Sequence, residues 1–131
     1  MTIYAFSSGP GISGVAVIRV SGPDASNVIK LLTGKKIPEA RKATLRKINN
    51  INTSELIDEG IIIWFPGPQS YTGEDMVEIH VHGSKAVVLS VQNEISKVEN
   101  CRLAEPGEFT KLAFQNGKIN LLKAESIADL I

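Results

Sequence analysis

Apolar and polar positions repeat along this chain with two different periods, which predict strands and helices in alternation. Apolar residues at every second position indicate half-buried strands, and a spacing near 3.6 indicates amphipathic helices. Glycine and proline between these runs mark the expected turns. The pattern favours an α+β fold, a mixed β-sheet with flanking helices. Strands are predicted at 3–6, 15–21, 44–48, 57–65, 76–82 and 102–104, and helices at 22–34, 84–98, 108–116 and 120–131.

The predicted strand 76–82 has one apolar and one polar face. Side chains at alternate positions of a strand point to the same side of the sheet. The face expected to meet the core consists of Val77, Ile79 and Val81. The opposite face consists of Met76, Glu78, His80 and His82. We therefore expect Glu78 to look toward solvent or a pocket.

Arg19 is an isolated charge in the β-branched strand 15–21, a run that suggests burial on both faces. It shares a strand face with Val15 and Val17, so solvent explains it poorly. A lone buried ion costs several kcal/mol unless another group pairs with it. Arg19 and Glu78 should therefore pair either with each other or with a ligand, and the residues alone leave both interpretations open.

Composition restricts the classes of protein that this chain can belong to. Its 131 residues suffice for one domain, and 14 basic and 14 acidic residues cancel. A net charge of zero argues against strong attraction to nucleic acid or an anionic membrane. A single cysteine and no basic-plus-apolar N-terminal segment indicate the cytoplasm. The run 120–131 carries no helix stop signal, so we expect more protein to follow.

Several motifs that could carry chemistry have simpler interpretations. The run 9–14 reads G-x-G-x-x-G, but β-branched residues follow it at once, which favours a bend over a dinucleotide site. No phosphate-binding G-x-x-x-x-G-K-[ST] motif occurs in the chain. His80 and His82 project to one face, yet too few further ligands accompany them to predict a metal site.

No catalytic residue is predicted from local spacing. Glu74 and Asp75 are adjacent and would point to opposite sides of an extended chain, so we interpret them as loop residues. Lys118 follows the helix-ending pair Asn116-Gly117, where a cation complements the helix dipole.

Spaced motifs in order along the chain resemble the N-terminal domain of the MnmE (TrmE) family of tRNA modification GTPases. They are WFPGP at 64–68, YTGED at 71–75, HG at 82–83, AEPGEFT at 104–110 and AESIADLI at 124–131. The chain departs from the commonest pattern at Gly9, Ile12, Ser13 and Ser84. Because the resemblance covers essentially the whole chain, it is more specific than any single motif.

The resemblance implies a fold similar to the tetrahydrofolate-binding domain of folate-dependent aminomethyltransferases. Residues 1–119 would form a folate-binding and dimerisation domain, and 120–131 would begin a helical domain. The implied ligand is 5-formyltetrahydrofolate, and the family's contact positions match Arg19, Glu78 and Lys118. A pterin presents an exocyclic amine and an adjacent ring N–H, two donors that one carboxylate can accept side by side.

For the full-length protein, the resemblance implies GTP hydrolysis coupled to modification of the wobble uridine of tRNA at C5. A carboxymethylaminomethyl-type group would be added together with the FAD-dependent partner MnmG (GidA). GTP, Mg and K would bind only in a GTPase domain outside this chain. The resemblance also implies a homodimer and no contact with a membrane. tRNA would be the substrate of the full complex, and this domain alone would not bind it strongly.

Two other functions remain open from the sequence. The chain could be a purely structural dimerisation module in which Arg19 and Glu78 form a buried ion pair. It could also perform folate-dependent methyl or aminomethyl transfer itself, although no general base with a local partner can be named. In the structural case, substitution of either charge should destabilise the fold by about 3–5 kcal/mol. In the ligand case, Glu78→Ala should abolish binding of 5-formyltetrahydrofolate while the fold survives.

Overall fold

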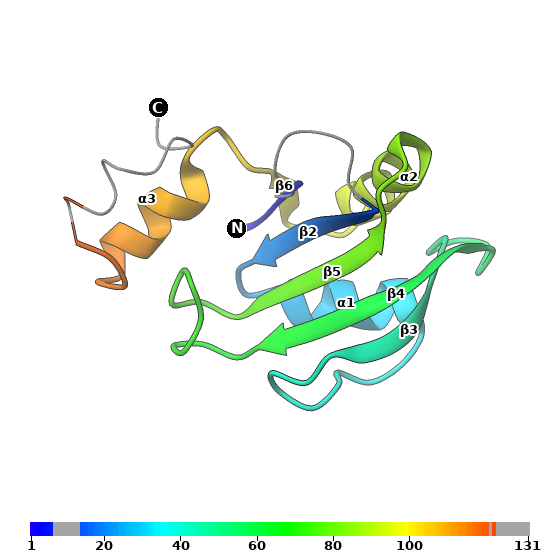
Figure 1. Ribbon diagram of the computed structural model, residues 1–131, viewed down its shortest axis with the longest axis horizontal. Helices are drawn as coiled ribbons and strands as arrows, with labels where there is room; N and C mark the ends of the chain where they lie inside the picture. The colour runs from blue at the N-terminus through cyan, green and yellow to red at the C-terminus, as the bar shows by residue number, and fades with distance from the viewer. Residues whose placement is uncertain (7–13, 121, 123–131) are drawn as a thin grey trace.

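The structure is a computed structural model that describes residues 1–6, 14–120 and 122. Within these residues it contains one mixed sheet of six strands and three helices, which confirms the expected α+β fold (Figure 1). The elements are β1 (Thr2–Phe6), β2 (Val15–Ser21), α1 (Ala25–Thr33), β3 (Thr44–Asn49), β4 (Leu56–Phe65), β5 (Met76–His82), α2 (Lys85–Ser96), β6 (Cys101–Leu103) and α3 (Glu108–Gln115).

The predicted elements within the described ranges are confirmed, with ends that differ by a few residues. The first helix begins at Ala25 because the residues before it form a turn that is fixed by β1 and by the residue before β5. The Gly22 N–H donates to the Asp75 carbonyl at 2.9 Å, and the Asp24 N–H donates to Thr2 Oγ1 at 2.8 Å. The predicted bend at 9–14 and helix at 120–131 lie almost wholly outside the described residues.

The strand order is β3-β4-β5-β2-β1-β6. Neighbouring strands are antiparallel except β1 and β6, which are parallel. This order brings β2 against β5, although 54 residues lie between the paired residues Ser21 and Met76 and include helix α1 and two other strands. The central strands of the sheet are therefore those that carry Arg19 and Glu78.

Helices α1 and α2 cover one face of the sheet and bury its main core (Figure 1). Alternate residues of the central strands point to this side, among them Ile18, Val77 and Ile79, all fully buried. Each such aliphatic side chain contributes about 1.5–3 kcal/mol on burial. The same alternation sends the remaining residues of β2 and β5 to the opposite face.

Helix α3 covers one end of that opposite face. Its Phe109 packs against Ile3 and Met76 in a second, smaller core. The rest of this side of β2, β3, β4 and β5 has no helix over it among the described residues, and we call it the open face. It consists of Val15, Val17, Arg19, Leu45, Lys47, Glu59, Ile61, Ile63, Glu78, His80 and His82, as the strand pairing shows.

Gly60 allows β4 and β5 to approach closely beneath the open face. A Cβ added to Gly60 would lie 2.1 Å from the His80 carbonyl oxygen, which is backbone and cannot move aside. Residue 60 therefore has to be glycine for the strands to pair in this register. No helix in the described residues is both long and apolar enough to cross a bilayer.

Candidate ligand site on the open face

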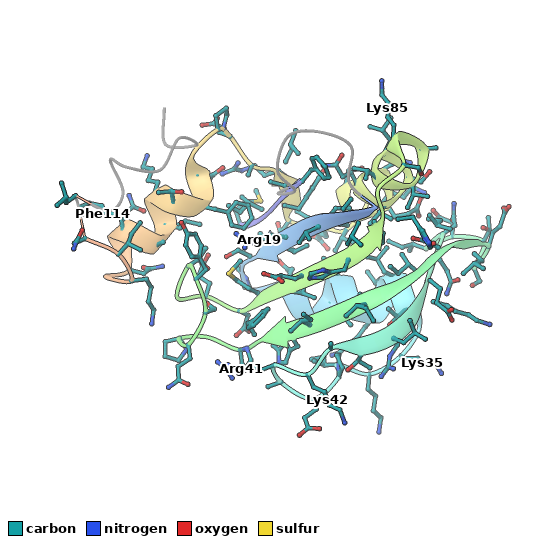
Figure 2. The ribbon with its side chains drawn as sticks, viewed as in Figure 1. Arg19, Lys35, Arg41, Lys42, Lys85 and Phe114 are labelled. Carbon is teal, nitrogen blue, oxygen red and sulfur yellow. The ribbon has the colours of Figure 1, made fainter. Side chains whose placement is uncertain are left out.

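Arg19 and Glu78 lie directly opposite one another on paired strands. Residue 19 of β2 is in register with residue 78 of β5. Arg19 Nε is 3.4 Å from Glu78 Oε2, so the two charges form an ion pair. Their register places both side chains on the open face, on the two central strands of the sheet, and Figure 2 shows Arg19 there.

The pair is only partly buried. The Arg19 side chain is 36% exposed and the Glu78 side chain 20% exposed. The expectation that β2 is buried on both faces is wrong, because α3 covers only one end of this side of the sheet and Val15 is 50% exposed. The apolar neighbours of Arg19 are themselves at the surface. Arg19 therefore lies at the partly exposed surface of the sheet and not in the centre of the core.

Arg19 is incompletely satisfied by this contact. Its Nε atom is buried, and among the described residues it has no hydrogen-bond partner, because the 3.4 Å approach to Glu78 lacks hydrogen-bond geometry. The guanidinium carbon lies 5.7 Å from the centre of the Tyr71 ring, a cation–π distance. A buried N–H without an acceptor is uncommon in native proteins and calls for an explanation.

Glu78 also contacts a histidine on its own strand. His80 Nε2 is 3.0 Å from Glu78 Oε1, and since a carboxylate accepts, the imidazole N–H donates. An ionised carboxylate has about four lone-pair positions, of which this hydrogen bond uses one. Glu78 can therefore accept two further parallel hydrogen bonds from a ligand.

The loop 66–75 between β4 and β5, here the Tyr71 loop, forms one wall of the site. Its Thr72 hydroxyl is 2.7 Å from Ser21 Oγ, and the Thr72 carbonyl accepts from Asn116 Nδ2 at 2.6 Å. The Tyr71 hydroxyl lies 3.4 Å from Thr110 Oγ1. These contacts connect the loop to both β2 and α3, so the Tyr71 ring is held in place over Arg19.

Glu74 and Asp75 have the loop roles that their adjacency predicts. Glu74 Oε1 accepts from Ser21 Oγ at 3.1 Å, and Asp75 Oδ1 accepts from the Gly67 N–H at 2.8 Å. Both carboxylates thus serve to shape the Tyr71 loop.

Lys118 reaches the same loop from the end of α3. Gly117 has φ 71°, and the N–H of Lys118 donates to the Ala113 carbonyl at 2.8 Å, which closes the helix in a Schellman motif. The Lys118 side chain then lies against Gly73, where an added Cβ would be 3.2 Å from Lys118 Cε. The three predicted ligand residues therefore come from β2, β5 and the end of α3, with the Tyr71 loop in contact with Arg19 and Lys118.

A small pocket of about 80 Å³ opens beside Glu78. Its lining residues are Phe65, Tyr71, Met76 and Glu78. Two aromatic rings and one thioether offer flat, polarisable surface to a planar ring, and the carboxylate is the charged acceptor at its border. The pocket is suited to the edge of a heterocycle that carries hydrogen-bond donors.

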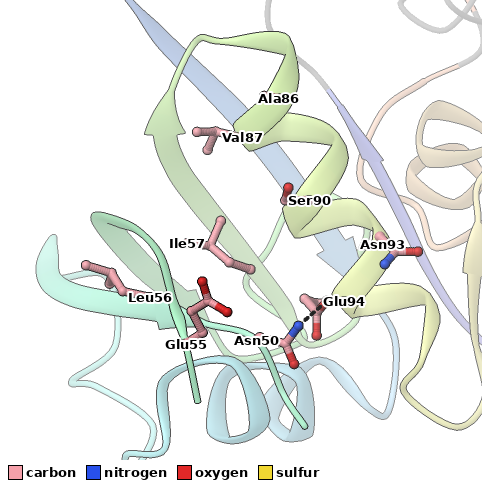
Figure 3. Close-up of a pocket in the computed structure, with 9 residues that line it drawn as sticks. All are labelled: Asn50, Glu55, Leu56, Ile57, Ala86, Val87, Ser90, Asn93 and Glu94. Carbon is pink, nitrogen blue, oxygen red and sulfur yellow. Dashed lines mark hydrogen bonds between the residues drawn. The ribbon is translucent and has the colours of Figure 1, made fainter. Parts of the chain in front are cut away.

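A larger hollow of about 470 Å³ lies elsewhere, between α2 and the turn that joins β3 to β4 (Figure 3). Glu94 is the buried charge at its end, but the fold already uses this carboxylate. Lys97 Nζ lies 2.9 Å from Glu94 Oε2, and the Ile51 N–H donates to Oε1 at 2.8 Å. The role of Glu94 is to join the turn to the helix.

The second histidine of β5 also has a carboxylate partner. His82 is exposed, and its Nδ1 lies 2.8 Å from Asp58 Oδ1 while its backbone N–H donates to Oδ2 at 2.9 Å. Burial raises the pKa of Asp58, but the hydrogen bonds from His82 outweigh this effect and lower the pKa below 3.8. Among the described residues, no three His, Cys, Asp or Glu side chains are grouped as a metal site would require.

Comparison with known proteins identifies the family. A family model described as "GTP-binding protein TrmE N-terminus" matches residues 2–118. This chain belongs to that family. The resemblance inferred from the spaced motifs is thus confirmed.

Relatives of this TrmE N-terminus chain have names that refer to tRNA. It is 76% identical over 131 residues to the tRNA modification GTPase MnmE of Pelagibacter ubique, with all of this chain and 30% of that protein aligned. It is 50% identical over 131 residues to the mitochondrial 5-taurinomethyluridine-[tRNA] synthase subunit GTPB3 of Homo sapiens, with 99% of this chain and 27% of that protein aligned. The MnmE of Zymomonas mobilis is 48% identical over 130 residues.

The chain spans about 30% of the length of the MnmE relative from Pelagibacter ubique. The MnmE relatives are named as tRNA modification GTPases, and this chain corresponds to the TrmE N-terminus. The proposed boundary at 119 and the beginning of a helical domain at 120–131 stay predictions.

Sequence reasoning found part of this site and missed the rest. Strand alternation predicts that His80 shares a face with Glu78, but it does not indicate that the imidazole donates to that carboxylate. Tyr71 belongs to the motif at 71–75, and the motif by itself indicates no role for its ring. No periodicity in the loop indicates that its ring lies over Arg19, because the loop conformation depends on contacts with β2 and α3.

Proposed function

We propose that this chain binds 5-formyltetrahydrofolate on its open face, between Glu78, Arg19 and Lys118. The Glu78 carboxylate would accept hydrogen bonds from the exocyclic amine and the adjacent ring N–H of the pterin. The edge of the ring would enter the small pocket beside Glu78 and Tyr71. Arg19 and Lys118 are suited to carbonyl, formyl or glutamate-tail oxygens. The single observation that carries this proposal is the buried Arg19 Nε without a hydrogen bond beside a carboxylate with unused capacity.

The size of the ion-pair contribution favours a ligand over a purely structural role. A surface-like pair contributes about 0–1 kcal/mol, whereas loss of one partner from a buried pair costs about 3–5 kcal/mol. With Arg19 36% exposed and Glu78 20% exposed, the pair is nearer the first case. Stability alone therefore gives little reason for these charges at the centre of a sheet.

The first prediction concerns folate binding and Glu78. At tenfold excess over Kd, the folate should stabilise the folded chain by about 1.4 kcal/mol, which raises Tm by about 5 °C. Glu78→Gln should abolish this shift, because an amide cannot accept two parallel N–H donors, while changing the melting temperature without folate by less than about 3 °C. Differential scanning calorimetry and titration calorimetry measure both quantities.

Glu59→Gln is the matched control for this experiment. Glu59 is an exposed carboxylate on β4, outside the pocket that contains Glu78. It should retain the full folate-induced shift. An unchanged folate affinity in Glu78→Gln would contradict its contact with the pterin. A fall in stability of about 3 kcal/mol in Glu78→Gln, with no response of the parent chain to folate, would favour the purely structural role.

In the full-length protein we propose that this domain presents the folate one-carbon unit for modification of the wobble uridine of tRNA at C5. The carboxymethylaminomethyl-type group would be installed in the cytoplasm together with the FAD-dependent partner MnmG. GTP and its Mg and K ions would bind in a separate GTPase domain. The names of the full-length relatives, which refer to tRNA and GTPase activity, support this assignment.

We also propose that the chain forms a homodimer. Exposed aliphatic side chains on the open face support this, with Val15 50% and Leu45 58% exposed around an apolar groove of about 310 Å³. Sedimentation velocity at micromolar concentration should give twice the monomer mass. Leu45→Glu should yield monomer, whereas Leu103→Glu, at the other edge of the sheet, should not; a monomeric parent chain would contradict the dimer.

A further inference from the structure

The zero net charge of the chain conceals a very uneven distribution. Six of its 14 lysines and arginines lie within residues 35–47, where Glu39 is the single acidic residue. Acidic residues concentrate instead in the later part of the chain, from 55 onward. A local excess of charge can bind a polyanion even when the whole molecule is neutral, because the field at the surface depends on nearby charges.

The structure places these six cations along one margin of the molecule. They lie on β3, which is an edge strand of the sheet, and on the segment that leads into it. Figure 2 shows Lys35, Arg41 and Lys42 spread along this margin, with Lys85 at the opposite side of the molecule. We call the set the basic edge: Lys35, Lys36, Arg41, Lys42, Arg46 and Lys47.

Little in the fold neutralises the basic edge. Lys42 Nζ lies 3.7 Å from Glu39 Oε2, but the two side chains are 68% and 77% exposed, so solvent screens this ion pair. Lys47 is in register with Glu59 across the strand pair. Lys35 and Lys36 are exposed, and Arg46 has a buried Nε without a hydrogen-bond partner among the described residues.

The basic edge is connected to the candidate folate site. Arg41 donates its backbone N–H to the Trp64 carbonyl at 2.8 Å and a guanidinium N–H to the Gln69 carbonyl in the Tyr71 loop. Ile63, next to Trp64, is in register with Glu78. Because β4 separates β3 from β5, the edge strand lies about 10 Å from the strand of Glu78. A polymer held along the edge would therefore pass close to the open face.

We propose that the basic edge binds the phosphate backbone of tRNA. The choice of tRNA rests on the proposed function. The polyanion itself follows from the exposed cations of the edge, which are Lys35, Lys36, Arg41, Lys42 and Lys47. Phosphate contacts from lysine and arginine position an RNA without reading its sequence. An anionic membrane is the less suitable partner, because surface-bound segments use an amphipathic helix with an apolar face, whereas this edge is a strand and a loop.

The test uses the 131-residue chain and a fluorescently labelled tRNA transcript. Fluorescence anisotropy would be measured between 50 and 200 mM KCl for the parent, for Lys36→Gln/Lys42→Gln, and for the control pair Lys85→Gln/Lys111→Gln. The slope of log K against log salt is negative, and each lost phosphate contact should make it shallower by about 0.7–0.9. Affinity at 100 mM KCl should fall at least tenfold in the basic-edge pair and less than twofold in the control pair.

Equal losses in the two pairs, or no binding of tRNA by the parent at 50 mM KCl, would overturn the proposal. So would binding of phosphatidylglycerol vesicles in preference to tRNA through the same lysines. Melting curves check that each pair folds, and the folate-induced shift should persist in both. If the basic-edge pair loses tRNA binding but keeps the folate-induced shift, the loss is specific to the basic edge. If the parent chain binds tRNA but shows no folate-induced shift, the proposed folate site is contradicted and the basic edge is not.

Discussion

Glu78 shows how one side chain on an open sheet face can be prepared for a ligand. His80 donates to one of its oxygens, and Arg19 lies near the other without a hydrogen bond. The carboxylate is thereby oriented while several of its lone pairs stay available. Because a neighbouring donor already orients the carboxylate, less side-chain entropy is lost when a ligand binds.

His80 should therefore act as a positioning residue. His80→Phe keeps a planar ring on the open face but removes the N–H donor to Glu78. We expect folate affinity to fall about fivefold, the equivalent of about one hydrogen bond. Titration calorimetry measures the change, and His82→Phe, whose partner is Asp58 and not Glu78, should bind folate within twofold of the parent. The reverse order of effects would exclude this role for His80.

At the scale of elements, the turn between β3 and β4 is held by a single buried side chain of α2. The Glu94 carboxylate accepts hydrogen bonds from the Ile51 N–H and from Lys97 Nζ. The bond from Ile51 joins the turn between β3 and β4 to helix α2. Burial raises the pKa of Glu94, but these hydrogen bonds outweigh it and lower the pKa below 4.5. Glu94 is therefore ionised in the folded protein at neutral pH.

Glu94→Gln should destabilise the fold by about 2 kcal/mol at pH 7, the value of hydrogen bonds to a charged group. A carboxyl with a lowered folded pKa contributes its full stability above its unfolded pKa and loses it as pH falls through the folded value. The difference between parent and variant should thus be constant from pH 7 to 5 and shrink as the pH falls below the ordinary glutamate pKa of 4.5. Urea unfolding at pH 7, 5 and 3 measures it.

Glu99→Gln is the control for this pH series. Glu99 is an exposed carboxylate just beyond α2. Its substitution should change stability by less than about 0.5 kcal/mol at every pH. A Glu94→Gln deficit that grows on acidification would show that the carboxylate does not carry the interaction.

At the scale of the whole molecule, the two cores on opposite faces of the sheet have different structural roles. The main core beneath α1 and α2 holds the strands together, and the smaller core around Phe109 fixes α3 and, through it, the Tyr71 loop. The candidate site lies where α3 ends and the sheet is left open. A ligand there would contact β2, β5, the loop and the end of α3 at once.

Folate binding should therefore protect two distant segments together. Amide hydrogen exchange at 70–75 and 113–118 should slow in the presence of 5-formyltetrahydrofolate, because both segments surround Lys118 and Tyr71. Exchange in the turn 50–55, which belongs to the other end of the fold, should not change. Mass spectrometry of peptides resolves the three segments, and protection confined to 50–55 would place the ligand elsewhere.

Local patterns in the sequence determined the elements and the direction of their side chains. Alternation in 76–82 placed Val77 and Ile79 toward the core and Glu78 with His80 away from it, as the structure confirms. Glycine and proline located the turns within a few residues. These features depend on residues close together in the chain, where periodicity and turn chemistry act directly.

The tertiary structure alone decided which strands are neighbours and which face is covered. Strand alternation cannot show that β2 pairs with β5 in the register that places Arg19 opposite Glu78. It also cannot show that α3 stops short of Arg19, which left that side chain 36% exposed where apolar neighbours suggested burial. Pairing and coverage depend on contacts between residues far apart in the chain, and a local pattern carries no information about them.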